Sequence, residues 1–325
     1  GTNAGTLTLN MTRAALIPYA IKGWELWNNT EKWLFGGVGT RKVNGLSLAF
    51  TEEEEELLFK RVEARQAMGA PIKFISGRKA QLLEPGLNDS VRSAAWCNKD
   101  GFTIAYLTGH AFRRALKQEN VSVREYSKVN KIEIEKNYFK IIFENNEHLK
   151  AKRIVLAGGV WLEEMLNWLN VKIKIKCLIN QLIITERMPP VMKTVLSIAN
   201  GLLSLKQFDN GTVLIGGGWQ GIGDKKRGGV ESIPENLIGN IRLACHVIPK
   251  LRYGRMVRVW LGLEAETADA LPIIGKIPGI SNAYVIGSVH SGYASGPYMG
   301  WLLSQLIMGQ EPEMPLFDPN RLINK

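Results

Sequence analysis

The chain has 325 residues, 45% of them hydrophobic, and a formal net charge of +11, so it can bury a substantial core, and its length predicts two domains. No apolar run approaches the ~18 residues that span a bilayer, and the N-terminus lacks the order of a signal peptide, so we expect a soluble, cytoplasmic protein with no transmembrane segment. The lysines and arginines are scattered, with no aromatic-interleaved basic cluster, which favours a solvated surface over nucleic-acid binding and leaves anionic substrates open.

Three helices are predicted before residue 121. Apolar residues at near-helical spacing predict a helix within residues 12–28. Thr51 followed by Glu54 has the spacing of a capping box, which predicts that a second helix starts there. A third helix is predicted over LTGHAFRRALKQEN, residues 107–120.

The apolar period changes to two from Val121 onward, and the sequence predicts strands. These are VSVREY (121–126), KVNKIEIEK (128–136), YFKIIFE (138–144) and AKRIVLAGG (151–159). Later elements are a helix at 158–170, strands at 171–186 and 211–217, a helix at 234–248, a strand at 282–287 and a helix through 296–309. This interleaving predicts a mixed α/β fold with a strand-rich domain inserted into an α/β domain.

One glycine-rich stretch is a candidate dinucleotide-binding site. In VLIGGGWQGIGDK, residues 213–225, Gly216, Gly218 and Gly221 have the spacing G-x-G-x-x-G. That motif binds a pyrophosphate only where a helix follows the turn, and no helical periodicity follows Gly221. We therefore predict a glycine-rich hairpin or loop with close backbone approach, rather than a nucleotide site.

Cysteine usage predicts neither disulfides nor a metal site. Cys97, Cys177 and Cys245 are odd in number and widely spaced, with no C-x-x-C. We expect thiols in a reducing compartment.

Three stretches carry most of the functional information. RIVLAGGVW (153–161) is a short apolar strand ending in Gly158 and Gly159, and GTNAG (1–5) places small residues around one amide. The C-terminal stretch 271–309 joins an apolar strand, a turn containing His290, Gly292 and Gly296, and an amphipathic helix. Exposed N–H groups at such a helix start favour an anion or a carbonyl that gains negative charge.

The segment RVWLGLEAETADALPIIGKIPG (258–279), followed by residues 292–300, closely resembles the C-terminal signature of the FAD-dependent D-amino acid oxidase superfamily. In particular it resembles the branch of glycine oxidases and of sarcosine, proline and opine dehydrogenase β-subunits. GTNAG, DGFTIAYLTGHAFRRAL and RIVLAGGVW occur in the order that this family uses, so the resemblance spans essentially the whole chain.

The resemblance implies FAD as cofactor and a set of residues that hold it. Asn3, Ala4 and Gly5 would line the flavin, Val129 would lie near the adenine, Ala157 and Gly158 would approach the pyrophosphate, and Gly292 and Tyr293 would cover the pyrimidine end.

The sequence departs from the family pattern in three places. The first strand with its G-x-G-x-x-G would precede Gly1, so we expect an N-terminally truncated Rossmann-like domain that holds FAD poorly without roughly forty upstream residues. Glu264 stands where related enzymes often have a carboxylate-binding arginine, which favours the dehydrogenase branch. The usual G-H-G is shifted to His290-Ser291-Gly292, which puts a catalytic role of His290 in doubt.

The resemblance implies oxidation of a C–N bond by hydride transfer to the flavin, followed by hydrolysis of the imine. The backbone N–H groups of Gly292, Tyr293 and Ala294 would stabilise the negative charge that builds on the flavin, so no dedicated acid or base is required. Arg258, Lys206 and Arg41 are candidates for binding a substrate carboxylate. His290 and Tyr293 complete the catalytic candidates.

Two other functions stay open. A flavoenzyme of the same fold could oxidise a 2-hydroxy acid, which would require a histidine base. Alternatively, the chain could be a non-catalytic or partial subunit with a basic, partner-binding surface. For the oxidation of a C–N bond we expect an amine or amino-acid substrate and a partner subunit for electron transfer.

We assign residues 1–45, 99–175 and 265–325 to the FAD domain, and 46–98 and 176–264 to the substrate domain.

Overall fold

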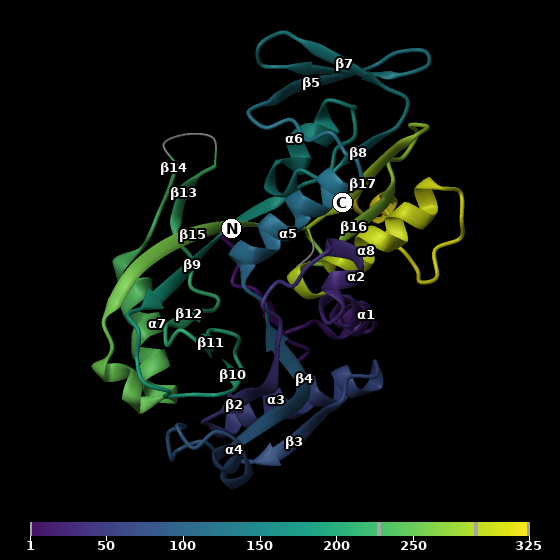
Figure 1. The fold of residues 1–325 in the computed structure, drawn as a ribbon. Helices are drawn as coiled ribbons and strands as arrows, with labels where there is room; N and C mark the ends of the chain where they lie inside the picture. The colour runs from purple at the N-terminus through teal and green to yellow at the C-terminus, as the bar shows by residue number, and fades with distance from the viewer. Residues whose placement is uncertain (1, 226–228, 289–291, 324–325) are drawn as a thin grey trace. The chain divides into compact units, whose positions relative to one another are not determined.

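The computed structural model describes residues 2–225, 229–288 and 292–323 and has a mixed α/β fold (Figure 1). The chain divides into two compact units. Unit 1 comprises 1–115, 179–262 and 293–295, and unit 2 comprises 116–178, 263–292 and 296–325. The division of the chain into an FAD domain and a substrate domain stays a prediction.

Of the helices of unit 1, α1 (Ile17–Trp27) and α3 (Glu52–Ala67) form where the sequence predicts them, whereas α2 (Thr30–Leu34) was not predicted. A 3-10 turn, η1 (Ala14–Leu16), leads into α1, and α2 follows. At the start of α3, the Thr51 hydroxyl accepts from the N–H of Glu54 at 3.2 Å. The Glu54 carboxylate in turn accepts from the N–H of Phe50 at 2.8 Å, one residue before the usual capping-box donor.

The remaining helices of unit 1 are α4 (Gly77–Leu83), the start of α5 (Ala105–Gln118), α7 (Pro234–Val247) and the 3-10 turn η3 (Pro249–Tyr253). None of the helices in the described part of the chain is long and apolar enough to cross a membrane.

A nine-stranded sheet forms the frame of unit 1 (Figure 1). Parallel pairing joins β2 to β10, and the other pairs with a defined register are antiparallel. The path order is β1 (Thr6–Leu7), β4 (Ser93–Phe102), β2 (Arg41–Ala49), β10 (Val195–Ile198), β11 (Ser204–Gln207), β12 (Val213–Gly216), β9 (Lys176–Thr185) and β15 (Met256–Glu266), with β3 (Ile72–Ser76) paired to β4.

Two hydrophobic clusters pack against this sheet. One combines strand residues with the inner face of α7, including Leu205 of β11, and Val259 of β15 packs on it. The other combines α1 and α3 with the start of the sheet. Because side chains alternate along a strand, Lys206 and Arg258 lie on the sheet face opposite to Leu205 and Val259.

The glycine-rich stretch 213–225 does not form a strand-turn-helix unit. After β12 the chain turns into a hairpin of β13 (Ile222–Asp224) and β14 (Gly229–Glu231), and α7 begins only at Pro234. Gly217 has a φ of +136°, and a Cβ there would lie 2.4 Å from the carbonyl oxygen of Leu202. The predicted hairpin with close backbone approach is therefore confirmed.

Unit 2 contains two three-stranded sheets and its own hydrophobic cluster. One sheet is antiparallel, with β5 (Val129–Ile134), β6 (Phe139–Phe143) and β7 (His148–Ala151). In the other, β17 (Ala283–Gly287) lies between β16 (Ile273–Lys276), antiparallel, and β8 (Ile154–Leu156), parallel. The helical elements are η2 (Gly159–Trp161), α6 (Leu162–Asn167), most of α8 (Gly292–Ile307) and η4 (Pro319–Leu322).

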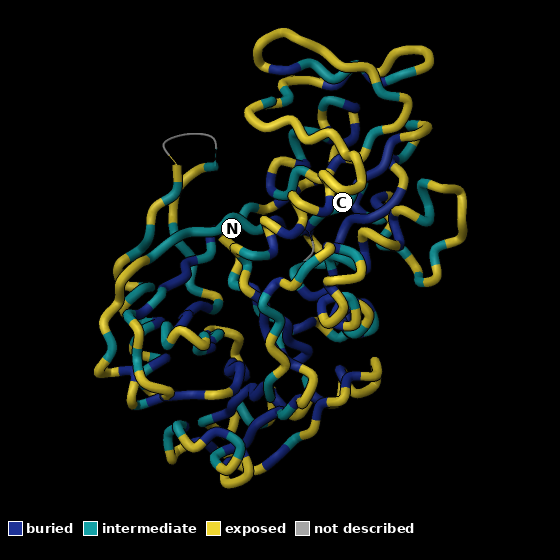
Figure 2. Tube along the Cα trace, viewed as in Figure 1, coloured by how far each residue is buried: buried dark blue, intermediate teal, exposed yellow. Residues whose placement is uncertain are grey.

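One strand prediction was wrong and another was wrong in part. Residues 121–126 form no strand, and every one of them is exposed (Figure 2), so their alternating pattern has no core to bury. Residues 171–175 alternate between buried and exposed as predicted, but β9 begins only at Lys176.

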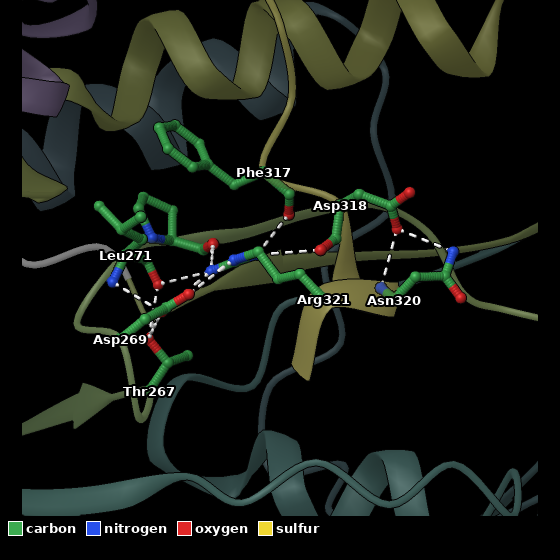
Figure 3. A network of polar contacts seen from close by, with 8 residues as sticks. Thr267, Asp269, Leu271, Phe317, Asp318, Asn320 and Arg321 are labelled. Atoms are coloured by element: carbon green, nitrogen blue, oxygen red, sulfur yellow. Dashed lines mark hydrogen bonds and ion pairs between the residues drawn. The ribbon is translucent and has the colours of Figure 1, made fainter. Parts of the chain in front are cut away.

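The C-terminal segment is fastened by Arg321 (Figure 3). Its guanidinium pairs with Asp269 at 2.9 Å and donates to the backbone carbonyls of four residues. These are Leu271, Pro272, Phe317 and Asp318. Nearby, the N–H of Ile274 in β16 donates to the Phe317 carbonyl at 3.0 Å.

Candidate active site

The N-terminal loop of unit 1, residues 2–5, is held in place by hydrogen bonds of its backbone. The N–H of Gly5 donates to the Asn3 side chain at 2.7 Å, and the N–H of Thr103 donates to the Gly5 carbonyl at 2.8 Å. Gly5 has a φ of +71°, and a Cβ there would lie 2.4 Å from the Thr103 carbonyl oxygen. Gly5 is therefore buried against Thr103, while Asn3 is exposed and Ala4 half-buried.

Tyr293, in the first turn of α8, is fixed at both ends of its side chain. Its hydroxyl lies 2.5 Å from the Thr103 hydroxyl and 2.6 Å from that of Thr108. Its ring stacks on Trp27 with centroids 4.9 Å apart and planes 3° from parallel. Burial raises the pKa of Tyr293, and the two threonine hydrogen bonds oppose that shift. The phenol is thus neutral at physiological pH.

The backbone of this helix turn has a specific partner. Pro297 lies inside α8 and has no N–H, so the helical bond to the carbonyl of Tyr293 is missing. The indole N–H of Trp27 donates to that carbonyl at 2.7 Å. Gly23 of α1 permits the close approach, since a Cβ there would lie 1.9 Å from the Ala294 carbonyl oxygen.

Lys206 is buried on β11. Its ammonium donates to the hydroxyl of Thr6, the residue that follows the N-terminal loop. The rings of Phe102 and Phe208 lie with their centroids 5.8 Å from the nitrogen and meet each other edge to face. Burial lowers the pKa of Lys206 to about 7.

The other two carboxylate-binding candidates are exposed. Arg41, at the start of β2, forms an ion pair with Asp209, so its guanidinium is already engaged. Arg258 has no ion pair or hydrogen bond from its side chain to another described residue. Two residues further along β15, the indole N–H of Trp260 donates to the Thr2 carbonyl at 2.9 Å. The strand face that carries Arg258 therefore adjoins the N-terminal loop.

A buried carboxylate supports the chain beyond that loop. Asp100, fully buried, accepts from the Thr8 hydroxyl at 2.6 Å, the N–H of Leu9 at 2.8 Å and the Asn10 amide at 3.2 Å. Burial raises the pKa of Asp100, and these hydrogen bonds oppose the shift. This network fixes residues 8–10, and so it also fixes the chain where it leaves the N-terminal loop.

Unit 2 brings glycine-rich ends of two parallel strands together. β8 and β17 are parallel neighbours, so Ala157-Gly158-Gly159 and Gly287-Ser288 follow them at the same sheet edge. That edge is where parallel sheets bind nucleotide-like ligands. Ala157 is exposed, and the buried Ser288 hydroxyl has no hydrogen-bond partner among the described residues. This small, partly unsatisfied edge fits the phosphate-bearing part of a dinucleotide cofactor.

Other predicted residues occupy separate positions. Val129 is the first residue of β5 and packs on the unit 2 cluster. Gly292 is the first residue of α8, and Ala294 is buried in the cluster around α1. His290 lies outside the described residues.

The structure links several predicted residues within unit 1. Asn3 and Gly5, Tyr293 and Lys206 are joined through Thr103 and Thr6. Sequence reasoning missed the residues that support them: Thr6, Trp27, Phe102, Thr103, Thr108 and Phe208. Phe102, Thr103 and Thr108 lie within the resembling segment DGFTIAYLTGHAFRRAL, and that resemblance is the signal that could have indicated them. In the described ranges no three His, Cys, Asp or Glu side chains gather in a metal-binding group.

Comparison with protein families gives a match over residues 1–306 to the family model described as DAO, FAD dependent oxidoreductase. Among curated proteins, an opine oxidase subunit of Rhizobium meliloti is 26% identical over 261 residues, covering 78% of this chain and 67% of that protein. Glycine oxidase of Geobacillus kaustophilus is 22% identical over 294 residues, covering 89% and 76%.

Solved structures share the fold. The crystal structure of glycine oxidase from Geobacillus kaustophilus superposes with a TM-score of 0.88 at 20% identity, covering 99% of this chain and 87% of the other. L-proline dehydrogenase from P. horikoshii gives 0.84 at 23% identity, covering 95% and 83%. The predicted mixed α/β fold is confirmed, as is the family resemblance.

Proposed function

Because the chain belongs to the DAO family of FAD-dependent oxidoreductases, we propose that it oxidises the C–N bond of an amino acid or a secondary amine. Bound FAD supplies the hydride acceptor, and the imine product hydrolyses in water. Relatives with this overall sequence similarity are named as an opine oxidase subunit and a glycine oxidase, which supports a nitrogen-bearing substrate.

The residues assigned to FAD in this proposal are backbone groups and small side chains. Asn3, Ala4 and Gly5 would line the flavin, and Gly292 and Tyr293 at the start of α8 would cover its pyrimidine end. Ala157 and Gly158 would approach the pyrophosphate, and Val129 would lie near the adenine. The N–H groups at the start of α8 stabilise negative charge near them, because they have no acceptor within the helix.

Arg258 carries the proposal for substrate binding. It is exposed and has no anionic partner among the described residues, and it lies on the face of β15 next to the N-terminal loop. A guanidinium binds a carboxylate through two parallel hydrogen bonds. Lys206 is buried and Arg41 is paired with Asp209, so both are less suited to this role.

Anaerobic mixing of the flavoprotein with three substrate panels tests the proposal. Amino acids and secondary amines should bleach the flavin absorbance, whereas 2-hydroxy acids of matched size should leave it oxidised. Bleaching by hydroxy acids alone would replace the proposal with hydroxy-acid oxidation. Bleaching by none of the three panels, with dithionite bleaching intact, would favour a non-catalytic subunit.

Electron transfer to a partner subunit is part of this proposal. Two of the related proteins are named as subunits of larger enzymes, one of an opine oxidase and one, HcnC, of a hydrogen cyanide synthase. We expect substrate-reduced protein to reoxidise at least tenfold faster with an artificial acceptor dye than with air-saturated buffer. Equal rates with both would identify it as an oxidase.

A further inference from the structure

Lys206 is a buried amine whose one hydrogen-bond partner among the described residues is a hydroxyl. The residue is 2% exposed, its nitrogen hydrogen-bonds to Thr6, and the ring centroids of Phe102 and Phe208 each lie 5.8 Å from that nitrogen. An ammonium group has three N–H donors, and burying a charge without a counter-ion is costly. A buried lysine in this setting readily exists as the neutral amine, which is a proton acceptor.

The groups around Lys206 allow its nitrogen to gain or lose a proton. Thr6 faces it from β1, Phe102 from β4, and Leu214 is its register partner on β12. Arg41 of β2 and Asp209 after β11 pair with each other, and the Asp100 carboxylate of β4 accepts from Thr8, Leu9 and Asn10. Arg258 of β15, on the same sheet face, is exposed. Burial is the sole cause of the lowered pKa, which lies near neutrality.

The Thr6 hydroxyl is the link between this buried amine and the candidate site. Thr6 is half-buried, whereas Lys206 is fully buried, and the exposed Asn3 and half-buried Ala4 lie in the loop that precedes Thr6. A ligand bound next to that loop would therefore meet Thr6 before the lysine nitrogen.

We propose that Thr6 and Lys206 form a proton relay that deprotonates the substrate ammonium before C–N oxidation. The inference rests on the proposed function and names the group that prepares the substrate. An amine gives up a hydride readily only as the free base, because its nitrogen lone pair must form the C=N bond. Amino acids and secondary amines arrive in neutral solution mostly as ammonium ions, so a proton acceptor accelerates the reaction.

The relay conserves protons and involves no change of oxidation state. An N–H bond of the substrate ammonium breaks and an O–H bond forms at Thr6. At the same time the original hydroxyl proton of Thr6 moves to the Lys206 nitrogen, whose lone pair forms the new N–H bond. The products are a neutral substrate amine and an ammonium at Lys206, which returns its proton to solvent after turnover.

The test compares Lys206→Met, Thr6→Val and Thr6→Ser by the pH dependence of anaerobic flavin reduction. General base catalysis contributes typically ~10²–10⁴-fold. At pH 7, Lys206→Met and Thr6→Val should reduce the flavin about 100-fold more slowly than wild type. Above the pKa of the substrate amine, their rates should return to within about threefold, because the substrate is already deprotonated. Thr6→Ser keeps the hydroxyl and should keep the wild-type profile.

Calorimetry gives a readout that requires no turnover. The ligand is an amine whose carbon next to nitrogen carries no hydrogen, titrated at pH 7 in buffers of different ionisation enthalpy. Wild type transfers the ligand proton to Lys206, which is already about half protonated at pH 7, and should release about half a proton. Lys206→Met has no acceptor, so it should bind the ligand as the ammonium ion and release none. The exposed Lys250→Met is the matched control and should behave as wild type.

The outcomes separate this inference from the proposed function. If amines bleach the flavin of wild type and Lys206→Met with the same pH profile, the relay is wrong and amine oxidation stands. A slow Lys206→Met that high pH does not restore also overturns the relay, because it indicates lost packing. If Lys206→Met fails to hold FAD, the Thr6→Val and Thr6→Ser pair decides by the same criteria. If no amine bleaches any variant, both proposals fall.

Discussion

The indole N–H of Trp27 donates to the carbonyl of Tyr293, the acceptor that Pro297 leaves without a helical donor. The two rings also stack, so one tryptophan satisfies both the backbone and the side chain of Tyr293. This contact docks α1 on the first turn of α8. The proposed flavin-facing N–H groups are therefore positioned by a residue far away in the sequence.

Replacing Trp27 with phenylalanine should remove this hydrogen bond and keep an aromatic ring. We expect the free energy of unfolding to fall by about 1–3 kcal/mol, because a partly buried carbonyl loses its partner. Urea unfolding measures the change. Trp301→Phe is the control, since its indole donates to Glu313 at an exposed position and should cost less than about 0.5 kcal/mol. Equal effects of the two substitutions would argue against the role of Trp27.

Gly5→Ala should disturb the N-terminal loop beyond the strain of its positive φ. Gly69 also has a positive φ, +88°, but nothing lies within 4 Å of a Cβ placed there. We expect Gly69→Ala to cost roughly 1 kcal/mol. Gly5→Ala should cost more and reduce the FAD bound per protein chain, because the new methyl group meets the Thr103 carbonyl. The absorbance ratio of flavin to protein after gel filtration measures this, and an unchanged ratio would remove Gly5 from the proposed flavin site.

Arg258→Met should raise the KM for amino-acid substrates by about 10–100-fold and leave FAD content unchanged, because a bidentate charge-assisted contact is lost. Arg258→Lys should recover part of the loss, since lysine keeps the charge but not the fork. Steady-state kinetics with an acceptor dye measures both. Arg41→Met serves as control and should change KM less than threefold, as its partner is Asp209. The opposite ranking would identify Arg41 as the anchor.

Lys206 should make stability depend on pH in a defined direction. Its pKa is about 7 in the folded protein against 10.5 in the unfolded chain, so the unfolded state binds more protons between these values. The free energy of unfolding therefore rises with pH across that window and is lowered below it, by up to roughly 5 kcal/mol.

Lys206→Met removes this dependence. The variant should be more stable than wild type at pH 7, and the difference should shrink as the pH approaches 10. Urea unfolding at pH 6, 7, 8, 9 and 10 measures it. A constant difference across the series would mean that Lys206 titrates normally in the folded protein.

Local patterns predicted the fold well where they coincide with a buried face. Thr51 and Glu54 marked the start of α3, and the apolar spacing of α1 and α7 matched their buried sides. Residues 121–126 failed because alternation indicates a strand only where one face is covered.

The candidate site was predictable only in part. Small residues and glycines marked the N-terminal loop and the end of β8, since backbone approach requires them. The setting of Lys206 was not predictable, because its neighbours come from β1, β4 and the turn after β11. Likewise, no residue near Tyr293 in the sequence indicates that the Trp27 indole replaces the backbone N–H that Pro297 lacks.

Because of the hydrogen bonds of Arg321, the C-terminal segment opens as one unit. Between Met308 and Ile323 only Pro319 and Leu322 are buried, so the segment has little apolar area to hold it down. Four hydrogen bonds from the Arg321 guanidinium to Asp269, Leu271 and Pro272 attach it, as do bonds of Glu313 to Trp301 and Gln305 in α8. When the Arg321 bonds break, residues 317–323 should detach together, and the amide hydrogen of Ile274 loses its acceptor, the Phe317 carbonyl, in the same event. Amide exchange at Ile274 thus reports the sub-global opening of a region that does not include it.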